Sequence, residues 1–265
     1  MTIYADLVRY RDLFGNLFRR DFQARYKGSA LGILWSLANP LLLMAIYVVV
    51  FSVLWRVTDE IAHYPLYLLT GLAAWIFFST SLTTAARSML EHANIIRKTR
   101  FPRQLVPLSS VATQLVTFAV MLVVLLVVNA IVIPEARDTM LLAVPLAVVF
   151  AAFVGGLSIA VAAANVLFRD VEHLLGALLL PWFFLTPVLY SFAQLPGVDE
   201  HEKLVDALRW GNPVTPAIEA IRAPLWAGDL PRAADVVYLC VAAGLSLALG
   251  AWVFNRADDR IAVEL

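Results

Sequence analysis

The chain has 265 residues, of which 61% are hydrophobic and only 15% are charged. Soluble domains carry roughly a quarter charged residues, so this composition excludes an ordinary soluble protein, and the net charge of zero gives no sign of a nucleic-acid partner. The charges gather in short segments between long apolar runs, a distribution that indicates a polytopic membrane protein. A single cysteine, Cys240, excludes an internal disulfide, and its apolar surroundings predict a buried thiol.

The first thirty residues predict an amphipathic helix in the membrane interface, with its cations toward anionic headgroups. On a helical wheel the apolar and polar residues separate onto two faces. The apolar face holds Ile3, Leu7, Tyr10, Phe14, Leu17 and Phe18, and the polar face holds Arg9, Asp12, Asn16, Arg19 and Arg20. The alternative is an ordinary amphipathic helix packed on a partner. No apolar core of the length of a cleavable signal peptide is present here.

Six apolar segments follow, each near the roughly 20 residues that a helix needs to cross hydrocarbon. They span residues 31–55, 65–86, 104–133, 140–164, 174–192 and 234–254. The first contains Pro40, and the fifth contains Pro181 and Pro187. Because an interior proline removes a backbone hydrogen bond, the fifth segment is predicted to be bent or broken. The fold class is therefore all-α, with six transmembrane helices.

The lysines and arginines of the connecting segments predict the orientation. One side collects fourteen: Arg9, Arg11, Arg19, Arg20, Arg25, Lys27, Arg87, Arg97, Lys98, Arg100, Arg103, Arg169, Arg256 and Arg260. The other side collects six: Arg56, Arg137, Lys203, Arg209, Arg222 and Arg232. Since cytoplasmic loops carry the excess of positive charge, both termini are predicted to be cytoplasmic.

We expect one domain over residues 1–265. It comprises the interface helix in 1–30, five spans in 31–192, an extracytoplasmic segment in 193–232, and the last span with a cytoplasmic tail in 233–265. The extracytoplasmic segment mixes apolar residues with prolines and charges, which predicts short helices at the outer interface that can dip partway into the membrane.

The sequence lacks the residue patterns that several kinds of catalytic, metal-binding and nucleotide-binding sites need. The central parts of the six segments contain no Asp, Glu, Lys, Arg or His, unlike the proton-coupled transporters and intramembrane enzymes that place such groups there. The histidines (His63, His92, His173, His201) show no metal-ligand spacing, and no metal is expected. No phosphate-binding loop of the G-x-x-x-x-G-K-[ST] type occurs, and no catalytic set is visible. These observations favour a pore, a scaffold, or a conduit powered by another subunit.

Four stretches resemble the ABC-2 type permeases, specifically the branch that exports O-antigen, capsule, teichoic acid or related lipid-linked glycans. They are residues 25–35 (RYKGSALGILW) with Asn39 and Pro40, residues 165–171 (NVLFRDV), residues 186–190 (TPVLY), and Asn212 with Pro213. Their order and spacing match the family pattern over essentially the whole chain. The resemblance implies a homodimer in the bacterial cytoplasmic membrane. It also implies two copies of a separate cytoplasmic ATPase subunit that binds ATP and Mg²⁺.

The resemblance also assigns roles to two cytoplasmic connections. Residues 91–102 (EHANIIRKTRFP) form a short basic helix that couples to the ATPase, because a rigid helix end can pass nucleotide-driven motion to the spans. The coupling residues are Glu91, Asn94, Arg97, Lys98, Arg100, Phe101 and Pro102; the alternative is positive-inside charge without contact. Arg169 and Asp170 are expected to pair at the turn between the fourth and fifth segments, in a structural or a gating role.

A sugar chain needs a neutral wall, and aromatic faces bind sugars without strict directionality. The candidate wall residues are Tyr47, Phe51, Trp75, Phe77, Phe78, Trp182, Phe183, Phe184 and Tyr190; for each, the alternative is helix packing or the aromatic interface belt. The resemblance implies that the first and fifth segments line the channel and that Asn212 and Pro213 belong to an outer gate. The alternatives are an exporter of small hydrophobic compounds and a scaffold subunit of a glycan synthase.

Overall fold

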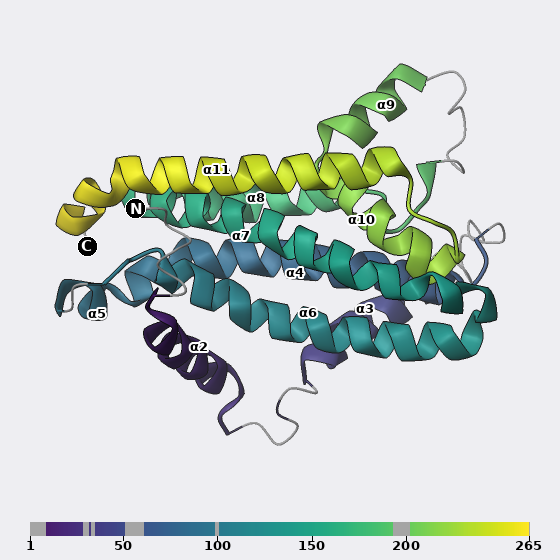
Figure 1. Cartoon of the computed structure of the whole chain (residues 1–265), viewed down its shortest axis with the longest axis horizontal. Helices are drawn as coiled ribbons and strands as arrows, with labels where there is room; N and C mark the ends of the chain where they lie inside the picture. The colour runs from purple at the N-terminus through teal and green to yellow at the C-terminus, as the bar shows by residue number, and fades with distance from the viewer. Residues whose placement is uncertain are drawn as a thin grey trace.

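The computed structural model describes residues 9–28, 32, 35–50, 61–98, 101–192 and 202–264. Phe51 and Arg100 lie outside these ranges. Every regular element in the described part is helical and none is a strand, which confirms the all-α class. The main helices run lengthwise side by side, and shorter helices close the two ends (Figure 1).

Four helices are long and apolar enough to cross a bilayer. They are α4 (Tyr64–Glu91), α6 (Leu105–Val132), α7 (Ala143–Leu167) and α11 (Ala233–Glu264). At 1.5 Å per residue, each exceeds the roughly 30 Å of a hydrocarbon core. They coincide with the second, third, fourth and sixth predicted segments, which confirms those four as candidate spans.

The first and fifth predicted segments form shorter helices in the described part. These are α3 (Trp35–Val48), which contains Pro40, and α8 (Asp170–Leu185), which contains Pro181. Thr186 has an extended backbone and precedes Pro187, whose ring disfavours a helical conformation at the residue before it. The predicted interruption of the fifth segment is thus confirmed, since the helix ends at Leu185.

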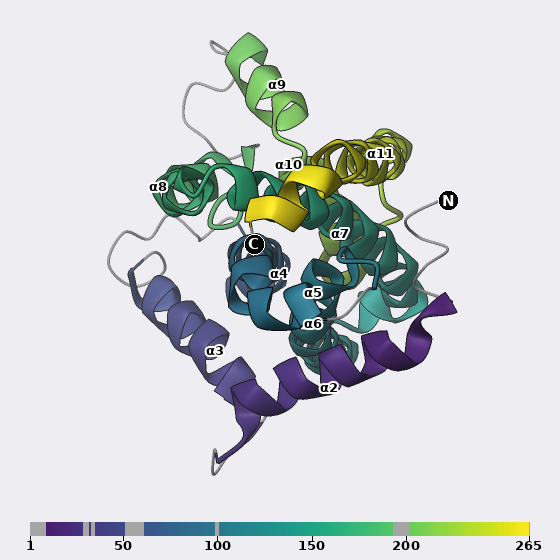
Figure 2. The same cartoon turned by 90° about the vertical axis from the view of Figure 1, so that its left-hand side faces the viewer.

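Short helices mark the two ends of the bundle. At one end, α2 (Arg11–Tyr26) lies across α6, near α5 (Ala93–Lys98) and the last turns of α11 (Figure 2). We refer to it as the α2 end. The opposite end, the α10 end, holds η3 (Pro134–Asp138), η4 (Met140–Leu142), α9 (Glu202–Gly211), α10 (Val214–Arg222) and the π turn η6 (Ala223–Ala227). The predicted helices between the fifth and sixth segments are present, but α10 is mostly buried against α4, α7 and α11 rather than lying at the surface.

The core consists of two clusters. The larger surrounds α4, where the rings of Phe77, Phe118 and Phe150 pack at centroid distances of 4.9–6.3 Å. The smaller, the α2-end cluster, joins α2, α5, α6, α7 and α11 through Leu17, Ile96 and other apolar side chains. Phe77 and Phe78 are both fully buried, so their rings serve helix packing within this chain.

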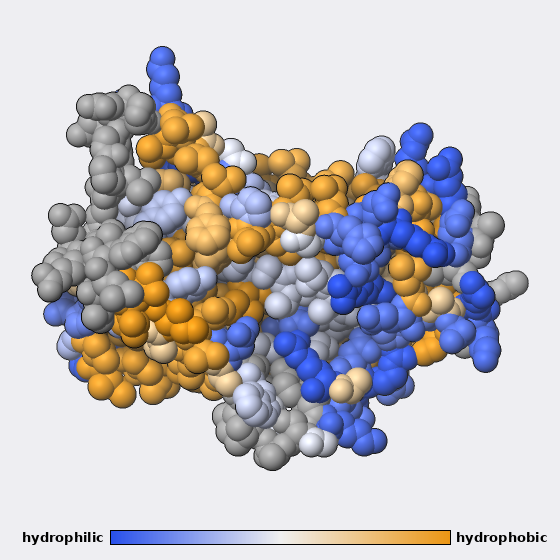
Figure 3. Space-filling model, turned by 180° about the vertical axis from the view of Figure 1, so that it is seen from behind, coloured by the Kyte–Doolittle hydropathy of each residue, from blue (hydrophilic) through white to orange (hydrophobic). Residues whose placement is uncertain are grey.

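The exposed surface is apolar over the length of the bundle and hydrophilic at the α2 end (Figure 3). Val123, Val148 and Leu245 are more than half exposed on three of the candidate spans. Such side chains are stable in contact with lipid rather than water. Cys240 is also exposed on α11, so the prediction of a buried thiol was wrong. A helical period alone does not reveal which side of an all-apolar helix faces its neighbours.

Candidate functional site

The short helix α5 presents its basic residues outward. Ile96 is buried in the α2-end cluster and anchors the helix, while Arg97 and Lys98 are exposed and form no ion pair with any described residue. The other predicted coupling residues surround them: Glu91 and Asn94 are exposed, and Phe101 and Pro102 are half-buried. The helix is thus held on its apolar side and leaves two unpaired cations available for a partner.

Polar contacts fasten α2 to the bundle beside α5. Asp21 accepts a hydrogen bond from Ser109 Oγ on α6 at 2.9 Å and lies 3.2 Å from His92 Nε2, just after α4. One turn further on, Arg25 donates to Gln114 Oε1, also on α6. Neither Asp21 nor Gln114 was singled out from the sequence, because the wheel pattern indicated only that α2 has a polar face.

A second connection ties the segment after α5 to the last helix. Arg103 Nη1 donates to the carboxylate of Asp258 at 2.7 Å and to its carbonyl at 2.9 Å. Through this pair and the α2-end cluster, the helices α2, α5, α6 and α11 are joined in one packed unit. The helix α5 therefore shares its packing with two of the long helices, α6 and α11.

At the turn between α7 and α8, the important residue is Asn165. Its side chain is buried, donates to the Ala86 carbonyl at 2.8 Å, and accepts from the Glu172 backbone N–H at 3.0 Å. The ion pair at this turn joins Arg87 to Glu172 at 2.7 Å. In the described part, Arg169 and Asp170 are exposed and form no ion pair with each other, contrary to the expected pairing.

The predicted aromatic residues of α3, α4 and α8 come together. Trp75 and Phe183 have ring centroids 5.5 Å apart, Phe78 and Trp182 are 5.1 Å apart, and Tyr47 stacks on Phe183 at 6.2 Å. Trp75, Phe78 and Phe183 are buried, whereas Tyr47, Trp182 and Tyr190 are half-buried and Phe184 is exposed. The buried members pack helices within this chain, so only the half-buried and exposed members have surface to offer a passing molecule.

Asn212 links the helices of the α10 end to the end of α8. Its Oδ1 accepts from Trp182 Nε1 at 2.8 Å, and its Nδ2 donates to Thr186 Oγ1 at 2.8 Å. Pro213 follows as the N-cap of α10, where a missing N–H costs little because the N–H groups at a helix start have no partner within the helix. The pair forms the junction between α9 and α10, fixed to the point where α8 ends.

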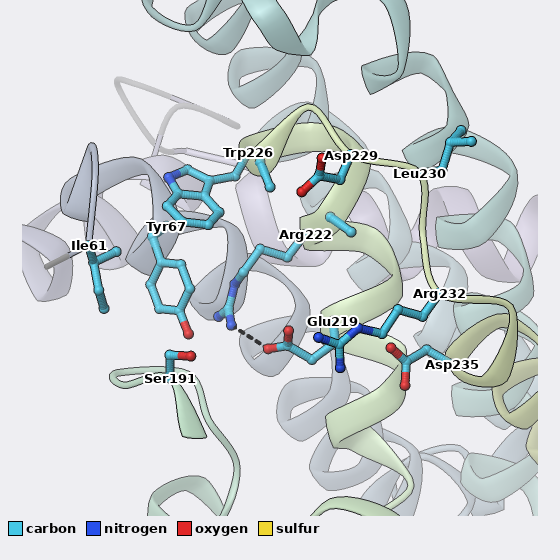
Figure 4. A pocket seen from close by; sticks show the side chains of 12 residues that line it. Ile61, Tyr67, Ser191, Glu219, Arg222, Trp226, Asp229, Leu230, Arg232 and Asp235 are labelled. Atoms are coloured by element: carbon cyan, nitrogen blue, oxygen red, sulfur yellow. Dashed lines mark hydrogen bonds and ion pairs between the residues drawn. The ribbon is translucent and has the colours of Figure 1, made fainter. Parts of the chain in front are cut away.

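Arg222 was counted from the sequence as an ordinary loop cation, yet its side chain is only 2% exposed. Its guanidinium donates to the Pro187 carbonyl at 3.0 Å and the Val188 carbonyl at 3.4 Å. It also donates to Glu219 Oε1 at 2.8 Å (Figure 4). The Tyr67 ring covers its face, with Cζ 3.7 Å from the ring centroid. A buried charge is tolerated when it is paired and hydrogen-bonded in this way. Arg222 therefore joins α10 to α4 and to the turn after α8.

The geometry describes a multi-pass helical membrane protein with a packed, outwardly basic α2 end and a separately organised α10 end. Residues 12–226 match the ABC-2 type transporter family, and the chain belongs to that family. It is a membrane permease, a transport subunit rather than an enzyme.

Named relatives agree with this assignment. An O-antigen export system permease protein RfbA from Myxococcus xanthus is 32% identical over 265 residues, which is the whole of both chains. Two proteins of the same name from Klebsiella pneumoniae are 35% and 36% identical over 186 residues, about 70% of each chain.

Proposed function

We propose that this permease exports a lipid-linked polysaccharide of the O-antigen type across the bacterial cytoplasmic membrane, powered by a separate ATPase subunit. The full-length identity to an O-antigen export system permease carries the proposal. The same relatives favour it over an exporter of small hydrophobic compounds and over a scaffold of a glycan synthase. ATP and Mg²⁺ would bind to the partner subunit, because this chain has no phosphate-binding loop.

We further propose that α3 and α8 complete a six-span fold and line the channel of a homodimer. Both helices pack on α4 and expose apolar side chains, among them Leu42 and Phe184. The surfaces that Tyr47, Trp182, Phe184 and Tyr190 leave uncovered would form the channel wall. The α2 end is cytoplasmic in this arrangement, because its cations follow the positive-inside rule, and the Asn212–Pro213 junction is part of the outer gate.

Deleting the gene for this chain tests the export proposal. Cells without it should lose the polysaccharide from their surface and accumulate the lipid-linked form inside, and the wild-type chain should restore display. Gel electrophoresis of the surface lipopolysaccharide, together with analysis of the intracellular lipid-linked pool, measures both quantities. Unchanged surface polysaccharide in the deletion strain would reject the proposal.

The coupling role of α5 is tested by reversing its charges. The double variant Arg97→Glu with Lys98→Glu should reduce the amount of ATPase subunit that purifies with the permease by about tenfold, because the loss of one charge-assisted contact already costs roughly 1.5–3 kcal/mol. Quantitative immunoblotting of the purified complex measures the ratio of the two subunits.

The matched control reverses two other exposed cations at the α2 end, Arg256→Glu with Arg260→Glu on α11. It changes the net charge by the same amount, so it should leave the subunit ratio near the wild-type value. Full retention of the ATPase by the α5 variant, or an equal loss in the control, would contradict a specific contact at α5.

A further inference from the structure

A pocket of about 510 Å³ opens at the α10 end, between the start of α4, the segment from α10 to η6 and the start of α11 (Figure 4). The side chains around it are mixed aromatic and charged, unlike the apolar groove between α8 and α9. Its lining includes the rings of Tyr67 and Trp226 and the charged side chains of Glu219, Arg222, Asp229, Arg232 and Asp235. The volume falls within the roughly 300–1,000 Å³ of small-molecule sites.

Hydrogen bonds hold the walls of this pocket in place. Tyr67 Oη donates to the Tyr190 carbonyl at 2.7 Å, and Trp226 Nε1 donates to the Ala62 carbonyl at 3.0 Å. The two rings meet edge to face at a centroid distance of 5.0 Å. Because these contacts use the polar atoms of both aromatic residues, the pocket is formed before any ligand arrives. Tyr67 is only 3% exposed, so the half-buried Trp226 ring supplies the apolar surface.

Some of the charged lining residues form ion pairs with described residues, and others form none. Asp235 accepts from Arg209 Nη2 at 3.0 Å through each of its oxygens, and Glu219 is bound to Arg222. Asp229 and Arg232, in contrast, are exposed and form no ion pair with any described residue. Within the part of the chain that the structure describes, the pocket therefore offers an acceptor and a donor that form no ion pair.

This combination of groups selects the chemical class of the ligand. Three carboxylates face two guanidiniums of the lining, and Arg209 neutralises the third carboxylate, that of Asp235, so the site has no excess of positive charge to attract a phosphate or another anion. Among the described residues, no group of three His, Cys, Asp or Glu side chains could hold a metal ion. A neutral polyhydroxyl compound fits better, because each hydroxyl both donates and accepts and so matches the Asp229 carboxylate and the Arg232 guanidinium, while the Trp226 ring offers an aromatic surface.

The position of the pocket relates it to the proposed route of the cargo. Ser191, which lines the pocket, directly follows Tyr190, the last of the candidate channel aromatics in the segment after α8. We propose that the pocket is a sugar-binding subsite that holds a short stretch of the exported glycan as it leaves the channel. The inference rests on the proposed function, since it takes a glycan as the cargo.

Binding of the released glycan to the purified complex tests the subsite. The permease with its ATPase subunit is placed in lipid nanodiscs and titrated by calorimetry with the O-polysaccharide of the host strain, freed of its lipid by mild acid. We expect saturable binding that weakens at least about tenfold in the double variant Asp229→Ala with Arg232→Ala, because two charge-assisted contacts are lost. Inorganic phosphate should not compete.

The matched control is Lys203→Ala with Asp206→Ala, an exposed cation and an exposed carboxylate on α9 that lie outside the pocket. It should bind the glycan as the wild-type complex does. No saturable binding by the wild-type complex, competition by inorganic phosphate, or an equal loss in the control would each overturn the subsite.

Surface display of the polysaccharide, measured in the same strains, separates this inference from the proposed function. If the wild-type chain restores display to the deletion strain but binds no released glycan, the subsite is rejected and the export function stands. If the deletion strain still displays the polysaccharide, the export function is rejected, and glycan binding to the pocket loses its basis.

Discussion

Replacing Arg222 with methionine should destabilise the permease strongly although no part of α5 or the α2 end is touched. The variant removes the donors to the buried Pro187 and Val188 carbonyls and the cation that covers the Tyr67 ring. Each buried carbonyl left without its donor costs about 1–3 kcal/mol. Unfolding in detergent should show a loss of roughly 2–6 kcal/mol for the two carbonyls together. Arg222→Lys should lose less, since the charge stays but the planar fork is gone.

A substitution at Gly71 on α4 tests the same contact of the Arg222 guanidinium independently. A Cβ at Gly71 on α4 would overlap the Arg222 guanidinium, so Gly71→Ala should displace it and also lower stability. In the Arg222→Met background the overlap with the guanidinium is gone, and the next nearest atoms to the new Cβ belong to Val188, at 3.2 and 3.3 Å. The double variant should therefore cost less than the sum of the two single variants.

Lys203→Met, at an exposed cation on α9, serves as the control and should change stability by no more than about 0.5 kcal/mol. Strictly additive effects of Gly71→Ala and Arg222→Met, or an Arg222→Met variant as stable as the wild-type chain, would show that the buried guanidinium does not hold the α10 end together.

Gly156→Ala should separate α7 from α11. A Cβ at Gly156 would lie 2.5 Å from the Leu247 nitrogen and 2.7 Å from the Ser246 carbonyl oxygen, both backbone atoms of α11. Backbone cannot rotate away as a side chain can, so the helices must move apart. Overpacking of this kind costs roughly 1–3 kcal/mol, and close helix contact through small residues is a main source of association energy in membranes.

The adjacent glycine provides the control. A Cβ at Gly155 would have its nearest neighbour at 3.9 Å, an ordinary contact with Leu108 Cδ2. Gly155→Ala should therefore be neutral or slightly stabilising, because alanine favours a helix by up to about 1 kcal/mol over glycine. Thermal unfolding of both variants measures the difference; equal melting temperatures would contradict the tight α7–α11 contact.

The sequence predicted the features of this fold that depend on composition alone. Runs of apolar residues are long enough to identify α4, α6, α7 and α11, and Pro187 explains why α8 ends where it does. The short helices of the α10 end were also expected. The burial of α10 within the bundle was not, because mixed composition indicates an interface but does not reveal contacts with helices distant in sequence.

The residues that join helices were harder to predict. Counting charges treats every loop cation as exposed, so it missed that Arg222 is buried against Tyr67, 155 residues earlier in the chain. One signal was available: Arg222 follows Glu219 by three residues within a largely apolar stretch, which is the spacing of an ion pair on one helix face. Similarly, Asn165 begins the NVLFRDV stretch, for which the sequence predicted a pairing of Arg169 with Asp170. In the structure the buried side-chain amide of Asn165 makes the contacts instead.

The central claim is that this chain is the membrane permease of an ATP-driven exporter, and affinity purification tests it most directly. The tagged chain would be extracted from its native membrane in mild detergent, and the proteins that accompany it identified by mass spectrometry. We expect a stoichiometric second subunit that contains a phosphate-binding loop. A chain that purifies alone, or with glycosyltransferases and no ATPase, would contradict the claim.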